Sequence, residues 1–123
     1  MKYKRVIIEE FGGPEVLKVV EEDKLPEPGK NEVRIRVKTA GAAFTDTLVR
    51  KGNYPGVKNK LPLTPGYDLV GVVDRNGANA IRYREGQMVA SLTVTGSYTQ
   101  YICLKESALV AVPDNLDPVK AVS

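Results

Sequence analysis

The alternation of apolar and polar residues is clearest at residues 33–38. Val33, Ile35 and Val37 fall on one side of an extended chain, and the residues that follow each of them are arginine, arginine and lysine. This period of two predicts a strand with one face in a core and a basic face outside. The basic face could be a binding stripe, but a solvated outer surface is the simpler interpretation.

Other short β-branched segments predict further strands, at residues 4–9, 16–20, 69–73, 88–92, 98–104 and 108–112. Residues 69–73 are apolar on both faces, which is typical of a fully buried strand. Glycine, proline, asparagine and aspartate predict turns at residues 12–14, 74–77 and 85–86 and a connector at 25–31. Residues 45–51 are the best candidate for a short helix. Short strands separated by frequent turns predict a mainly β domain, either a barrel or a sandwich.

Length and charge narrow the class of protein. A chain of 123 residues is the size of one domain, and 42% apolar with 27% charged residues is ordinary for a globular protein. The net charge of +3 is modest and its basic residues are scattered, so charge indicates neither nucleic acid nor an anionic membrane as a partner. No apolar run is long enough for a signal-peptide core or a membrane span, and we expect a cytoplasmic location.

The sequence contains no histidine and a single cysteine, Cys103. The absence of histidine excludes Ser-His, Cys-His and His-metal mechanisms. One cysteine cannot form an intrachain disulfide, and without histidine it cannot complete a tetrahedral zinc site of the usual kind. Cys103 is most simply a small apolar core residue. Neither Gly-x-Gly-x-x-Gly nor Gly-x-x-x-x-Gly-Lys-Ser/Thr occurs, so the chain lacks the common loops for dinucleotide and triphosphate binding.

Several ordered blocks remain, and together they carry a resemblance. They are GPEVL at 13–17, PEPGKNEVRIRV at 26–37, AGAAFTD at 40–46, PGYDLVGVV at 65–73, EGQMV at 85–89 and GSYTQY at 96–101. In this order and spacing they resemble the medium-chain dehydrogenase/reductase superfamily, most of all its zinc-free quinone oxidoreductase (zeta-crystallin-like) branch. The resemblance implies that residues 1–123 form the amino-terminal GroES-like domain, a partly open barrel with one or two short helices. The Rossmann cofactor domain of such enzymes would lie beyond this chain.

The resemblance also indicates which residues border the cofactor. Zinc-dependent members have a cysteine where this chain has Ala43 and often a histidine where it has Tyr67, so the resemblance implies no zinc. Ala43, Asp46, Tyr54 and Tyr67 are the candidate cofactor-binding residues, and no catalytic residue is assigned. Simpler roles stay open: Asp46 as an acid in the first helical turn, Tyr54 as a loop anchor and Tyr67 as a half-buried aromatic residue beside the turn. Arg50, four residues after Asp46, could pair with it or contact a ligand.

The resemblance implies an enzyme that transfers hydride from NADPH to a quinone or an activated alkene. The isolated chain is expected to be inactive and to bind no cofactor, because the phosphate site would lie in the missing Rossmann domain. Apolar surface near Phe44 and Tyr67 would then be uncovered, so self-association is expected. Gln87 stands where the family has aspartate, and no function follows from that change. The alternative is a non-enzymatic GroES-like binding or assembly module.

Overall fold

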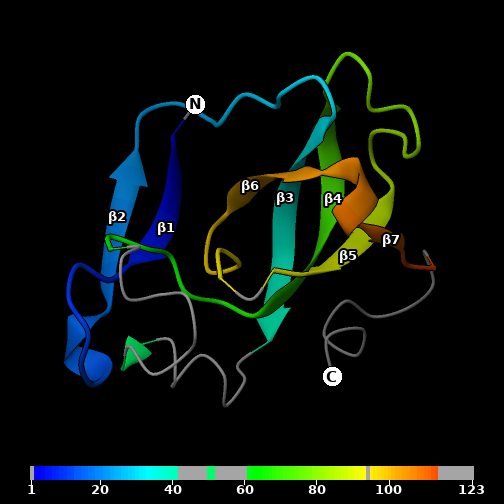
Figure 1. The fold of residues 1–123 in the computed structure, drawn as a ribbon. Coiled ribbons are helices and arrows are strands. Elements are labelled where there is room, and N and C mark those ends of the chain that lie inside the picture. The colour runs from blue at the N-terminus through cyan, green and yellow to red at the C-terminus, as the bar shows by residue number, and fades with distance from the viewer. Residues whose placement is uncertain (1, 42–49, 52–60, 94, 114–123) are drawn as a thin grey trace.

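The computed structural model describes residues 2–41, 50–51, 61–93 and 95–113. Most of the regular structure in these residues is strand, arranged in two sheets (Figure 1). The strands are β1 (Tyr3–Ile7), β2 (Lys18–Glu22), β3 (Glu32–Gly41), β4 (Asp68–Asn76), β5 (Met88–Leu92), β6 (Tyr101–Lys105) and β7 (Val110–Ala111). Two single-turn 3-10 helices, η1 (Pro14–Val16) and η2 (Glu106–Ala108), separate some of them. The prediction of a mainly β domain is confirmed, and within the described residues neither sheet closes into a barrel.

Strands β1 and β2 form an antiparallel pair, and the other five form an antiparallel sheet in the order β6-β3-β4-β5-β7. Strand β4 is therefore central in the larger sheet. Residues 61–67 lead from the small sheet to the start of β4, as the green segment in Figure 1 shows. This connection is tied to the small sheet by two backbone hydrogen bonds between Ile8 and Leu63, at 2.8 and 3.1 Å.

The alternation predicted for β3 is confirmed. Val33 and Ile35 are fully buried, whereas Arg36 and Lys38 are exposed. Arg34 differs from the other two basic residues, because its Nε donates to Asp74 Oδ2 at 2.7 Å. Its Nη1 also donates to the carbonyl of Pro26, at 3.3 Å. The first basic residue of the stripe therefore has a structural role.

The main core lies on the inner face of the larger sheet. It contains Val33, Ile35, Leu69, Val73, Ala80, Tyr83, Val89 and Leu109. A smaller core contains Ile8, just after β1, together with Val16 of η1 and Leu63. Gly71 of β4 lies close to β3: a Cβ there would meet Ile35 Cγ2 at 2.5 Å and the Arg36 carbonyl oxygen at 2.7 Å. Only glycine leaves room for the two strands at this point.

The turn predicted at residues 74–77 is wrong, because β4 continues to Asn76. Two tertiary partners hold this polar segment in the sheet. Asp74 forms the ion pair with Arg34, and Asn76 Nδ2 donates to the carbonyl of Tyr83 at 2.9 Å. The chain turns only after Gly77, whose carbonyl accepts from Ala80 N at 3.1 Å.

Several other predicted boundaries shift for identifiable reasons. Residues 98–100 do not belong to β6, because they bond to β1 through Val6 N to the Tyr98 carbonyl (2.8 Å) and Gln100 N to the Lys4 carbonyl (2.9 Å). The segment predicted at 108–112 keeps only two residues of strand, since η2 occupies its start. Residues 16–17 precede β2, because Val16 closes η1 and is buried in the small core.

The predicted helix at 45–51 lies outside the described residues except for its last two, and so does Asp46. Arg50 is described and contacts the turn between β1 and β2, while its pairing with Asp46 or with a ligand stays a prediction. Its Nε donates to the Gly12 carbonyl at 3.3 Å, and its own carbonyl accepts from Gly12 N at 2.9 Å. No helix in the described part of the chain has the length and apolarity to cross a membrane.

Candidate functional site

The turn formed by Pro65, Gly66 and Tyr67 immediately precedes β4. Pro65 and Gly66 are buried, and Tyr67 is half-buried. Gly66 has a φ of +120°, a conformation that side chains other than glycine rarely adopt. A Cβ at this position would lie 2.6 Å from Tyr98 N. Both the backbone conformation and the packing therefore require glycine here.

Residues 93 and 96–98 hold one side of this turn through main-chain hydrogen bonds. Thr93 N donates to the Tyr67 carbonyl at 2.7 Å, and Tyr98 N donates to the Pro65 carbonyl at 3.0 Å. A third bond joins Gly96 N to the carbonyl just before the turn, that of Thr64, at 2.7 Å. The turn and the segment after β5 are thus one hydrogen-bonded unit.

An arginine of β1 holds the other side. Arg5 Nη1 donates to Thr64 Oγ1 at 3.2 Å, while its Nε and Nη2 both donate to Glu22 Oε1 of β2, each at 3.2 Å. Charge-assisted hydrogen bonds of this kind are stronger than neutral ones. Both sheets therefore fix the position of the turn.

Two hydroxyls that the sequence analysis did not single out also contact the turn. Thr93 Oγ1 lies 2.9 Å from the Gly66 carbonyl oxygen and 3.2 Å from that of Tyr67. It also lies 2.5 Å from Ser97 Oγ, and Ser97 is completely buried. A threonine and a serine in a loop carry no local pattern that would have indicated this contact.

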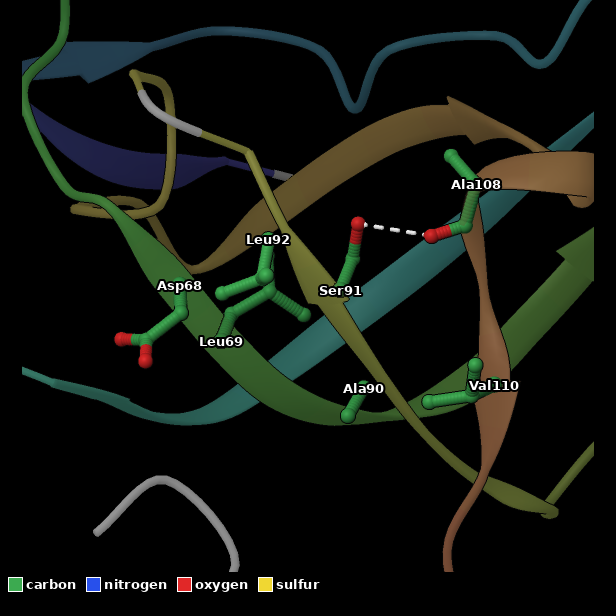
Figure 2. Close-up of a pocket in the computed structure, with 7 residues that line it drawn as sticks. All are labelled: Asp68, Leu69, Ala90, Ser91, Leu92, Ala108 and Val110. Atoms are coloured by element: carbon green, nitrogen blue, oxygen red, sulfur yellow. Dashed lines mark hydrogen bonds between the residues drawn. The ribbon is translucent and has the colours of Figure 1, made fainter.

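A pocket of about 430 Å³ opens beside the turn, beginning at Asp68, the residue after Tyr67. Its lining is largely apolar and comes from β4, β5, η2 and β7: Asp68, Leu69, Ala90, Ser91, Leu92, Ala108 and Val110 (Figure 2). The Ser91 hydroxyl is engaged by the protein, since Oγ donates to the Ala108 carbonyl at 2.9 Å. Figure 2 shows Asp68 at one end of the pocket and Val110 at the other. Leu92 and Val110 remain 69% and 61% exposed, which gives the pocket an apolar margin.

The fold and this turn can be compared with known proteins. The alcohol dehydrogenase GroES-like domain matches residues 29–114, which include β3 to β7 and the whole turn. The chain belongs to this family. The predicted resemblance to the medium-chain dehydrogenase/reductase superfamily is thereby confirmed.

Individual relatives of this GroES-like domain are full-length oxidoreductases and related proteins. Human quinone oxidoreductase is 38% identical over 109 residues, which are 88% of this chain and 33% of that protein. The crystal structure of Escherichia coli quinone oxidoreductase complexed with NADPH superposes with a TM-score of 0.88 at 28% identity, covering 97% of this chain and 36% of that one. The crystal structure of human synaptic vesicle membrane protein VAT-1 homolog-like protein superposes with a TM-score of 0.91 at 30% identity. The match covers 99% of this chain and 39% of that one. The chain thus spans about a third of the length of these proteins.

Of the four predicted cofactor-binding residues, the structure describes only Tyr67, which lies in the turn and is half-buried. This position fits the simpler role of an aromatic residue packed beside Pro65 and Gly66, and a cleft-lining role stays a prediction. Ala43, Asp46 and Tyr54 lie outside the described residues, as does Phe44. The roles given to them therefore remain predictions.

The part of the GroES-like domain that the structure describes shows no cradle for a dinucleotide's phosphates. Its glycines with left-handed φ are Gly66, Gly86 and Gly96. Protein atoms fill the space beside two of them, since a Cβ at Gly66 would lie 2.6 Å from Tyr98 N and one at Gly96 would lie 3.2 Å from Ile102 Cδ1. The amide of the third, Gly86, already donates to the Val73 carbonyl at 2.8 Å. Nor do the described residues bring together three or more Asp, Glu, Cys or His side chains suited to a metal ion.

Cys103 and Gln87, both noted in the sequence, contact backbone atoms of the protein. Cys103 is half-buried in β6 rather than in the core, with Sγ 3.6 Å from the Pro26 carbonyl oxygen. Burial, and then the nearby carboxylate of Glu32, raise the pKa of the Cys103 thiol to about 11, so it is protonated and unreactive at neutral pH. Gln87 closes a turn, because its Oε1 accepts from Arg84 N at 3.2 Å.

Proposed function

We propose that this chain is the amino-terminal domain of an NADPH-dependent oxidoreductase of the quinone oxidoreductase type. In the proposed reaction a quinone, NADPH and a proton give the hydroquinone and NADP⁺, the hydride coming from the dihydronicotinamide; an activated alkene would be reduced in the same sense. Support comes from the 38% identity to human quinone oxidoreductase over nearly the whole chain. A cytoplasmic location is part of the proposal.

The observation that carries the proposal is the apolar pocket beside the turn at residues 65–67. Hydride transfer needs no nucleophile from the protein, because the cofactor carries the reactivity. The protein must orient the two reactants and exclude water. Leu92 and Val110 supply exposed apolar surface for the ring of an acceptor, and the turn supplies a fixed wall at the end marked by Asp68.

The cofactor's phosphates have no cradle in the described residues, so we assign their binding to the two thirds of the relatives' length that this chain does not match. The chain by itself is then inactive and binds no NADPH. Catalytic oxidation of NADPH by the 123 residues alone, with a benzoquinone as acceptor, would refute this assignment.

A chimera tests the proposed function directly. Residues 1–113 would replace the matching part of human quinone oxidoreductase, to whose remaining two thirds we assign cofactor binding. NADPH binding, measured by nicotinamide fluorescence, establishes that the chimera is folded. We expect it then to reduce a benzoquinone at the expense of NADPH. A chimera that binds NADPH and reduces neither quinones nor enones would refute the proposal.

A pair of exposed aliphatic residues gives a matched control. Leu92 lines the pocket and Ile81 does not, and both are mostly exposed, at 69% and 87%. In the chimera, Leu92→Lys should raise the KM for the quinone about tenfold, because a charge must then be desolvated beside an apolar ring. Ile81→Lys should leave the KM unchanged. Equal effects of the two substitutions on the KM would refute the claim that the acceptor binds in this pocket.

The second candidate is a GroES-like binding or assembly module without enzymatic activity. The exposure of Leu92 and Val110 favours it, since contiguous exposed apolar surface often marks an interface. A ring-forming assembly would have a mass several times that of the 13.4 kDa chain in light scattering. A monomer or dimer would exclude the ring.

We also propose that the chain self-associates reversibly through the surface that contains Leu92 and Val110, and Val110→Lys should abolish this association.

A further inference from the structure

We propose that Thr93 and Ser97 are positioning residues that fix the backbone at Gly66 and Tyr67 through a chain of two hydroxyls. These two hydroxyls and the Gly66 and Tyr67 carbonyls that they hold are called the clamp, and it follows from contacts in this chain. Its consequence for catalysis rests on the proposed function, in which Tyr67 and Asp68 stand at the end of the acceptor pocket.

The direction of each hydrogen bond follows from the chemistry of the atoms. The carbonyl oxygens of Gly66 and Tyr67 can only accept, so the one hydroxyl proton of Thr93 must be donated to them, at 2.9 and 3.2 Å. Thr93 Oγ1 therefore has no proton left for Ser97 Oγ, 2.5 Å away. Ser97 must donate to Thr93. The order of donation runs from Ser97 through Thr93 to the turn.

The clamp joins segments that are distant in sequence, with Thr93 partly buried and Ser97 fully buried. Ser97 is 0% exposed, and its backbone N also donates to the Gly66 carbonyl, at 3.3 Å. Thr93 follows the last residue of β5 and lies 27 positions beyond Gly66. Since Thr93 N donates to Tyr67 as well, a single residue contacts two successive carbonyls of the turn. Because Ser97 is fully buried, water cannot easily replace its hydroxyl, and removing either hydroxyl loosens the hold on the Gly66 and Tyr67 carbonyls.

Placement of this turn bears on the proposed hydride transfer. Tyr67 is followed at once by Asp68, which lines the pocket, so a shift of the turn moves one end of the pocket. A misplacement of about 1 Å in a reacting pair can cost about 100-fold in rate. Neither hydroxyl is placed in contact with the acceptor, and both act through the turn.

The first test needs no enzymatic activity. Tyrosine rings labelled with carbon-13 would be observed by NMR in the 123-residue chain, which has six tyrosines. Thr93→Val keeps the shape of the side chain and removes the hydroxyl, whereas Thr93→Ser keeps the hydroxyl. We expect the Tyr67 signals to shift or broaden in Thr93→Val and Ser97→Ala and to be retained in Thr93→Ser. Tyr83, whose hydroxyl donates to the Leu109 carbonyl at 2.8 Å in the main core, is the internal reference.

A matched substitution separates the clamp from the general loss of a hydroxyl. Thr99 Oγ1 also donates to a backbone carbonyl, that of Tyr101, at 2.9 Å, and it does not contact the turn. Thr99→Val should leave the Tyr67 signals in place. The proposal is overturned if Thr93→Val leaves Tyr67 unchanged, or if Thr99→Val disturbs it equally.

The second test uses the chimera described above. Thr93→Val should lower kcat/KM for the quinone about tenfold and leave the affinity for NADPH unchanged, and Thr93→Ser should restore the original kcat/KM. An unchanged kcat/KM in Thr93→Val would refute the catalytic consequence. If the unsubstituted chimera is inactive, the proposed function fails, and the NMR experiment still decides whether the clamp exists.

Discussion

Removing one partner of the ion pair between Arg34 and Asp74 should lower the free energy of unfolding more than removing both partners together. Arg34 Nε and Asp74 Oδ2 lie 2.7 Å apart, and the two side chains are only 11% and 28% exposed, respectively. Asp74→Ala leaves the guanidinium poorly hydrated, with the Pro26 carbonyl still accepting from Nη1. Breaking a fully buried pair costs about 3–5 kcal/mol. Because Asp74 keeps some contact with water, we expect about 2–3 kcal/mol here.

Replacing both partners should cost much less than the sum of the single losses. The double variant Arg34→Met, Asp74→Leu removes both charges together with the desolvation penalty, and we expect a loss of at most about 1 kcal/mol. The exposed pair Lys2–Glu21 is the control, at 3.6 Å with side chains 64% and 48% exposed. Glu21→Ala should cost less than about 1 kcal/mol.

Urea denaturation followed by circular dichroism gives the free energy of unfolding of each variant, with the slope as a check on two-state behaviour. The reasoning fails if Asp74→Ala costs no more than Glu21→Ala. It also fails if the double variant loses as much as the single variants Arg34→Met and Asp74→Leu added together, since the losses would then be independent.

Three further substitutions or conditions test other contacts. Gly71→Ala should lower the free energy of unfolding by about 1–3 kcal/mol in urea denaturation, since the new methyl group would overlap Ile35 and β3 would have to move. Tyr83→Phe should cost about 1–3 kcal/mol in the same assay, because the buried Leu109 carbonyl loses its donor. Iodoacetamide should modify Cys103 slowly at pH 7 and about tenfold faster per pH unit up to its pKa of about 11; fast modification at pH 7 would contradict that value. Because folding raises this pKa above 9.0, the folded state should also lose stability, relative to Cys103→Ala, as the pH rises from about 9 to 11.

Local sequence patterns predicted the strands correctly where no distant contact changes the conformation that the segment itself favours. The alternation at Val33, Ile35 and Val37 identified β3, and the predicted bounds of β5 agree with the structure. Residues 74–77 have the composition of a turn, but the partner of Asp74 lies 40 positions earlier, and this distant contact keeps the segment in β4. Similarly, residues 98–100 have the character of a strand, and only the tertiary structure shows that they bond to β1.

The candidate site was predictable only in part, for the same reason. The resemblance led to Tyr67 because its block is contiguous in sequence. The clamp was missed because Thr93 and Ser97 contact carbonyls about 27 and 31 positions away, and backbone carbonyls have no sequence signature. The pocket was missed as well, since its lining comes from four separate elements.

The turn before β4 is continuous with the central strand of the larger sheet, and this has a consequence for motion. To displace Tyr67, the chain would have to break the bond from Thr93 N and begin to separate β4 from its neighbours. Such openings belong to the most protected class in native-state hydrogen exchange. We therefore expect the Thr93 amide to exchange about as slowly as the amides of the main core. A cleft built on this wall would open and close by movement of whatever faces it, with the wall itself standing still.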